Sequence, residues 1–97
     1  MKKKEEIISI LGEHRSDLCQ TYHLTKIGIF GSIIRGEEEP GSDIDILVDF
    51  NDDASLLDPS GLKIYLERIF GVSVDVIPER SIRAEIKDAI LLDVIYI

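Results

Sequence analysis

The sequence of 97 residues is poor in cysteine, lacks tryptophan and contains no long hydrophobic run. Cys19 is the only cysteine, so an internal disulfide is excluded, and its expected position in a helix suggests a packing role. No apolar stretch approaches the ~20 residues that span a membrane, and the segment MKKKEEIISI lacks the apolar core of a signal peptide. We therefore expect a cytoplasmic protein that does not contact a membrane.

Basic residues are also scarce: 11 Lys and Arg stand against 19 Asp and Glu, and the formal net charge is −8. This balance argues against direct binding of DNA or RNA, which normally requires basic side chains to neutralise phosphates. An acidic protein that handles a nucleotide would need a bridging cation. The length predicts one domain, residues 1–97, with a modest core.

Helical and strand periodicities alternate along the chain. The predicted elements are a helix at 3–20, a strand at 26–30, a short helix within 31–36, a strand at 43–50, a helix at 58–70, a strand at 72–77, a helix that begins near residue 81 and a strand at 94–97. They indicate an α/β or α+β fold, with a three- or four-stranded sheet and helices packed on one face.

The ends of two helices carry recognisable signals. Asp58 is expected to cap one helix, with Pro59 at its first position and Gly71 at its end. Ser81 is expected to cap the last helix, whose apolar positions are Ile82, Ile86, Ala89 and Ile90.

The strand DIDILVDF has one apolar face and one face that carries aspartates. Asp43 and Asp45 lie on the same side, roughly 6 to 7 Å apart along the strand, and can share Mg²⁺ or Mn²⁺. Asp75 faces the same way on another strand, so it can complete a site with two metal ions.

Gly31 and Ser32 stand where a strand turns into a helix. Backbone N–H groups at such a turn, with the Ser32 hydroxyl, are suited to bind phosphates, and glycine lets the backbone approach the ligand. Arg35 follows one helical turn later and can reach the same phosphates, or else pair with the acidic residues at 37–39.

Each of these features is common by itself. An Asp-x-Asp in a strand is most often a solvated face, and Gly-Ser pairs occur in many turns. A calcium loop of the EF-hand type is excluded because the required glycine and twelfth-position glutamate are absent. Their combination favours a functional site: a strand, Gly-Ser, a helix, a loop, an Asp-x-Asp strand, a helix and then a third aspartate on a strand.

The segment GSIIRGEEEPGSDIDILV resembles the signature of the minimal nucleotidyltransferases in the DNA polymerase beta-like superfamily: Gly-Ser, ten residues, then Asp-x-Asp. The segments VSVDVIP and DVIYI also match small members. The resemblance implies a mixed sheet and transfer of a nucleoside monophosphate from a triphosphate to a hydroxyl. It implies metal binding by Asp43 and Asp45, with Asp75 as third carboxylate and base, and triphosphate binding by Gly31 and Ser32.

One position departs from the family pattern. Ile34 stands where a small residue is common, which can crowd the turn but removes no ligand. We therefore expect an active enzyme.

Stand-alone members of this length resemble MntA-type antitoxins, which act with a HEPN-family toxin, a helical ribonuclease. The resemblance implies transfer of AMP from ATP to a tyrosine hydroxyl of that toxin. Two alternatives stay open: an antitoxin that occludes its partner without catalysis, and a homodimeric enzyme that modifies a small molecule.

Overall fold

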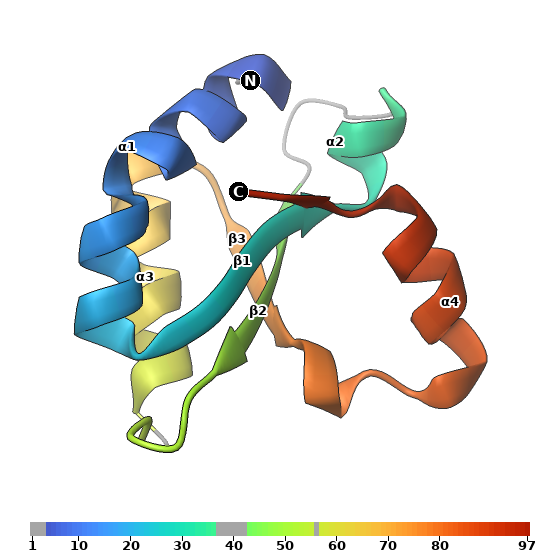
Figure 1. Cartoon of the computed structure of the whole chain (residues 1–97). Coiled ribbons are helices and arrows are strands. Elements are labelled where there is room, and N and C mark those ends of the chain that lie inside the picture. Colours follow the sequence, from blue (N-terminus) through green and yellow to red (C-terminus); the bar gives the residue numbers. More distant parts are fainter. Residues whose placement is uncertain (1–3, 37–42, 56) are drawn as a thin grey trace.

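The computed structural model describes residues 4–36, 43–55 and 57–97, which form a four-stranded mixed sheet with helices (Figure 1). The elements in chain order are α1 (Lys4–Tyr22), β1 (Leu24–Phe30), α2 (Ser32–Arg35), β2 (Ile44–Phe50), α3 (Asp58–Phe70), β3 (Val74–Pro78), the 3₁₀ turn η1 (Glu79–Ser81), α4 (Ala84–Asp93) and β4 (Ile95–Tyr96). The strand order is β3-β2-β1-β4, and only β2 and β3 pair in parallel. The expected fold class is confirmed, while residues 37–42, which include the acidic residues at 37–39, lie outside the described residues.

The main hydrophobic core lies between one face of the sheet and helices α1 and α3, which stand side by side in Figure 1. The predicted alternation in β2 explains why this face of the sheet is apolar: Ile44, Ile46 and Val48 point to it and are 0% exposed. The helices supply apolar residues at helical spacing, namely Ile7, Leu11, Leu18, Leu62, Leu66 and Phe70. This layer holds most of the buried apolar surface.

Helix α4 does not join that layer, so the expectation that all helices pack on one face needs correction. In Figure 1 it stands across the sheet from α1 and α3, and none of its residues is buried. Phe30 and Leu47 are buried but lie outside the main core. Of the apolar positions predicted for this helix, Ile82 precedes α4, Ile90 is half-buried, and Ile86 and Ala89 are exposed. None of the described helices is long and apolar enough to cross a membrane.

Both predicted N-terminal caps are wrong. Asp58 is the first residue of α3, and its Oδ2 accepts the N–H of Ser55 at 3.1 Å and contacts Nδ1 of His23 at 2.9 Å. Ser81 ends η1, where its hydroxyl donates to the Pro78 carbonyl at 2.8 Å, and α4 begins three residues later. In each case the side chain makes another hydrogen bond and does not cap the helix that follows. The predicted end of α3 at Gly71 is confirmed, with a φ of 70°.

Candidate active site

Two of the predicted carboxylates meet because β2 and β3 pair in parallel. Asp45 and Asp75 are register partners across this ladder. Partners in a parallel pair point to the same face, and neighbouring strands lie about 4.8 Å apart. Helix α3 makes this pairing possible, since parallel strands need a crossover connection. The structure thus brings together carboxylates that are far apart in the sequence.

Asp43 lies directly before β2 and is exposed. It precedes Asp45 by two residues, so an extended chain directs both side chains to the same side. Burial of the Asp45 carboxyl raises its pKa, and the negative charges of Asp75 and Asp43 raise it further, while Arg35 opposes the rise. The three aspartates therefore create a region of negative potential that a cation would relieve.

Gly31 turns the chain immediately beside Asp45. Phe30, the last residue of β1, is the register partner of Asp45 in the antiparallel pair. Gly31 has a φ of 81°, and a Cβ at this position would overlap Oδ2 of Asp45. Glycine is therefore required at this position for two reasons: the positive φ, and the close approach of the turn to the Asp45 carboxylate.

Helix α2 is anchored at this turn. The N–H groups of Ile34 and Arg35 donate to the Gly31 carbonyl at 3.1 and 3.3 Å. Ile33 is buried in the core, and Ile34 is partly buried against it. Ile34 thus finds space in the core, so the residue that departs from the family pattern is accommodated.

A cleft of about 300 Å³ opens between this turn and α4. Its lining on the side of the sheet includes Gly31, Arg35 and Asp45, three of the residues predicted from the sequence. The opposite wall is the uncovered face of α4, formed by Ile86, Ala89, Ile90 and Asp93. Asp43 and Asp75 are not among the lining residues.

Arg35 and Asp93 form an ion pair at this cleft, with Nη1 and Oδ2 3.0 Å apart. Sequence reasoning missed Asp93, and no local signal marks it, because α4 approaches α2 only in the folded chain. The alternative pairing of Arg35 with residues 37–39 concerns a segment outside the described residues.

The described residues contain no group of three or more His, Cys, Asp or Glu side chains already arranged around a metal position. The donor set nevertheless suits a hard cation, because Asp45 and Asp75 offer carboxylate oxygens from one side of the sheet and Asp43 directly precedes the same strand. Mg²⁺ usually keeps several waters and adds substrate phosphates to one or two carboxylates, so it does not require a preformed protein cage. The chemistry of these donors therefore fits a hard divalent cation.

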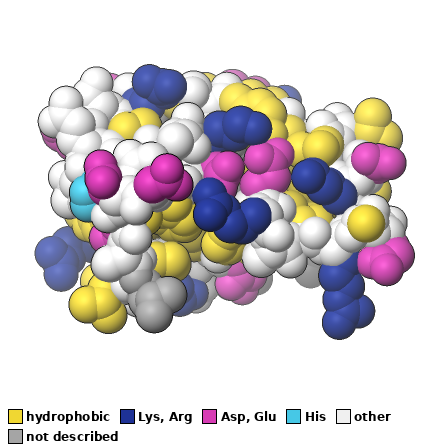
Figure 2. Space-filling model, turned by 60° about the horizontal axis from the view of Figure 1, so that its bottom comes forward, with side chains coloured by type: hydrophobic (Ala, Val, Ile, Leu, Met, Phe, Trp, Pro, Cys, Tyr) yellow, Lys and Arg dark blue, Asp and Glu magenta, His cyan; other side chains and the backbone are white. Residues whose placement is uncertain are grey.

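Charges of both signs are interspersed elsewhere on the surface. Figure 2 shows acidic side chains next to Lys and Arg side chains, with hydrophobic side chains between them. Lys26 pairs with Glu79 at 3.0 Å and Arg80 with Asp49 at 2.9 Å. The net negative charge is thus not gathered into one continuous acidic surface on the face in view.

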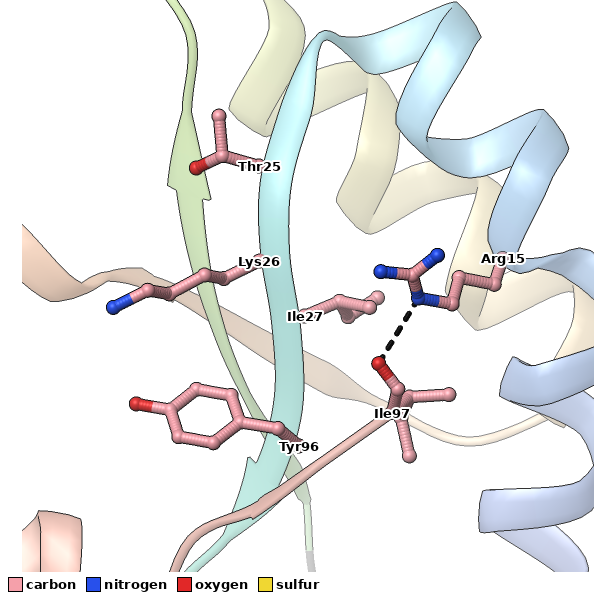
Figure 3. A pocket seen from close by; sticks show the side chains of 6 residues that line it. All are labelled: Arg15, Thr25, Lys26, Ile27, Tyr96 and Ile97. Atoms are coloured by element: carbon pink, nitrogen blue, oxygen red, sulfur yellow. Dashed lines mark hydrogen bonds between the residues drawn. The ribbon is translucent and has the colours of Figure 1, made fainter.

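Two other cavities lie away from the aspartates. One, of about 570 Å³, is at the opposite end of β2, near Phe50 and Arg80. The other, of about 180 Å³, lies beside β1, where Arg15 donates to the Ile97 carbonyl at 3.0 Å (Figure 3). Lys26 and Tyr96 extend to the other side of the strand in that view, and Lys26 lies 5.7 Å from the Tyr96 ring centroid. Neither cavity combines a glycine turn with carboxylates.

A mixed sheet with paired aspartates beside a glycine turn agrees with the nucleotidyltransferase class that the sequence resembles. The chain belongs to the Nucleotidyltransferase domain family, whose sequence pattern matches residues 11–97. It is 42% identical over 93 residues to the protein adenylyltransferase MntA of Thermococcus cleftensis, a match that covers 96% of this chain and 94% of that protein.

Solved structures agree with this assignment. One, assigned as a minimal nucleotidyltransferase, has a TM-score of 0.79 and 34% identity, and the match covers 93% of this chain and 92% of that one. Another, a toxin–antitoxin structure with AMP-PNP, has a TM-score of 0.69 at 23% identity, covering 87% of this chain and 69% of that one. The second likeness concerns the fold alone. The expected enzyme class, a nucleotidyltransferase of the adenylyltransferase type, is confirmed.

Proposed function

We propose that the enzyme transfers AMP from ATP to a hydroxyl of a partner protein, a tyrosine of a HEPN-family toxin, and so acts as an antitoxin. The observation that supports this most is the position of Asp45, in register with Asp75 on one side and against Gly31 on the other. A triphosphate at the glycine turn would thereby lie beside the carboxylates that must act on it.

The proposed roles follow from this arrangement. The amide groups at Gly31 and Ser32 would bind the triphosphate, with Arg35 as a further contact. Asp43, Asp45 and Asp75 would bind Mg²⁺, or Mn²⁺ in its place. When bound, the cation neutralises phosphate charge and makes the attacking hydroxyl more acidic.

Asp75 would accept the proton of the acceptor hydroxyl. Its position suits this role, because Asp75 is exposed while Asp45 is partly buried. The hydroxyl oxygen forms a bond to the α-phosphorus, the bond from that phosphorus to the bridging oxygen breaks, and pyrophosphate leaves. The rate gain would come mainly from positioning and charge neutralisation.

A protein acceptor is supported by the wall of the cleft. Ile86 of α4 lines it and is 52% exposed, which offers an apolar contact to an approaching polypeptide. The MntA relative is named a protein adenylyltransferase, and several structures with the same fold are MntA–HepT toxin–antitoxin complexes. We also place the enzyme in the cytoplasm, where ATP and Mg²⁺ are available.

The test is to incubate the enzyme with ATP, Mg²⁺ and the protein encoded by the neighbouring gene, and to measure intact masses. A gain of one AMP on a partner tyrosine is expected, and the Asp43→Asn, Asp45→Asn double variant should give none. A stable complex without covalent AMP would favour occlusion instead. Transfer to a small alcohol without any partner would favour the small-molecule enzyme, acting as a homodimer.

A further inference from the structure

The ion pair between Arg35 and Asp93 joins the glycine turn to α4. Arg35 ends α2, which begins directly after Gly31, and Asp93 is the last residue of α4. Their side chains are 46% and 34% exposed, and both line the cleft that contains Asp45. Under the proposed function, the pair therefore stands beside the triphosphate.

The cleft that should bind an anionic triphosphate is lined by more acidic than basic side chains among the described residues. Arg35 is the basic side chain among its described lining residues, while Asp45 and Asp93 are both acidic. The guanidinium of Arg35 already contacts an anion, the Asp93 carboxylate, at 3.0 Å. A phosphate that approaches Arg35 thus competes with the Asp93 carboxylate for the same donor.

Replacing the Asp93 carboxylate by a phosphate at Arg35 should cost little free energy. Partly exposed ion pairs contribute little to stability, and guanidinium groups bind phosphates with two hydrogen bonds in a fixed geometry. Release of Asp93 from Arg35 exposes no core residue of α4, because none of the residues of this helix is buried.

We propose that Asp93 sets the affinity for the nucleotide by competing with the triphosphate for Arg35. This inference rests on the proposed function and adds a positioning residue that acts through Arg35. Nucleotide binding then replaces the contact between α2 and α4 by a contact between Arg35 and phosphate. Removing the Asp93 charge should strengthen nucleotide binding, and only when Arg35 is present.

The test measures binding of AMP-PNP with Mg²⁺ by calorimetry, without any partner protein. Asp93→Asn should bind about two- to fivefold more tightly than the wild type, the range expected for a partly exposed ion pair. Asp93→Glu should retain the wild-type affinity. Arg35→Gln should bind more weakly, and adding Asp93→Asn to it should change nothing further.

Asp88→Asn is the matched control, because it removes the same charge from an exposed position on α4 that does not line the cleft. Unchanged or weaker binding by Asp93→Asn would overturn the inference, as would an equal gain in Asp88→Asn or a gain that persists without Arg35. These results require that the wild type binds AMP-PNP. Absence of that binding would overturn the proposed function itself, and this inference with it.

Discussion

The two sides of the sheet differ in what covers them. On one side, α1 and α3 bury an apolar strand face, and Ile44, Ile46 and Val48 are 0% exposed. On the other side, α4 has no buried residue, and the strands carry Asp45 and Asp75. Apolar burial stabilises the first side, whereas like charges repel on the second. Stability is thus concentrated in one layer, which allows the other to hold groups that destabilise the apo protein.

The largest effect is expected on the second side. Asp45→Asn should lower AMP transfer on the order of a thousandfold, because a group that stabilises the transition state is lost. Its thermal stability at neutral pH should not fall, because the change removes a charge that Asp75 and Asp43 repel. Radiolabelled transfer and thermal unfolding measure the two effects. Asp49→Asn, a change on the same strand, should retain transfer; equal losses in both variants would contradict the assignment.

Truncating one leucine on each side tests the division of stability directly. Leu66 of α3 is 0% exposed and Leu92 of α4 is 86% exposed. Leu66→Ala should lower the free energy of unfolding by about 3 kcal/mol, through lost burial and a cavity, while Leu92→Ala should change it by less than about 0.5 kcal/mol. Urea unfolding measures both. A loss for Leu92→Ala as large as for Leu66→Ala would show that α4 shares in the core.

Alanine substitutions at two glycines distinguish the effect of backbone strain from the effect of displacing the Asp45 carboxylate. Gly31 and Gly36 have φ values of 81° and 72°, so the backbone conformation alone should make alanine at either position cost about 1 kcal/mol of stability. Only at Gly31 would the new Cβ meet Asp45, whereas nothing lies within 4 Å at Gly36. Gly31→Ala should therefore lower transfer by about tenfold or more relative to Gly36→Ala. Equal kcat/KM values would mean that Asp45 adjusts without loss.

The smallest effect concerns a carboxylate on the helix side. The hydrogen bond with His23, and then that from the Ser55 N–H, lowers the pKa of Asp58 below 3.8. Such a group stabilises the fold above its unfolded pKa, and the contribution is lost as pH falls through the folded value. Asp58→Asn should therefore unfold at a lower temperature than the wild type at neutral pH.

The difference between Asp58→Asn and the wild type should shrink in acid. Unfolding temperatures measured from neutrality to well below pH 3.8 test this sign. The control is Asp52→Asn, an exposed position before the same helix. A gap that stays constant across this range would show that Asp58 acts without its charge.

Local patterns predicted much of the architecture. The alternation in DIDILVDF identified the buried face of β2, and Gly71 marked the end of α3, because both signals act through neighbouring backbone. The cap predictions for Asp58 and Ser81 failed, because several nearby groups compete for one side chain and the folded backbone decides which is closest.

Spacing and the family resemblance predicted Asp43, Asp45, Asp75, Gly31, Ser32 and Arg35 as site residues. The structure places Asp45 in register with Asp75 and against Gly31, while the catalytic and binding roles of all six residues stay predictions. The contact of Arg35 with Asp93 was not predicted, because an aspartate at the end of a helix carries no mark of its distant partner.

The amino-acid sequence by itself determined the family, the order of most elements and the set of acidic residues, since these depend on periodicity and on short spacings. Only the tertiary structure decided that Asp45 pairs in register with Asp75, that α4 stands apart from the other helices, and that Asp93 reaches Arg35. Those outcomes depend on strand register and on long-range packing, which relate residues that no local pattern connects.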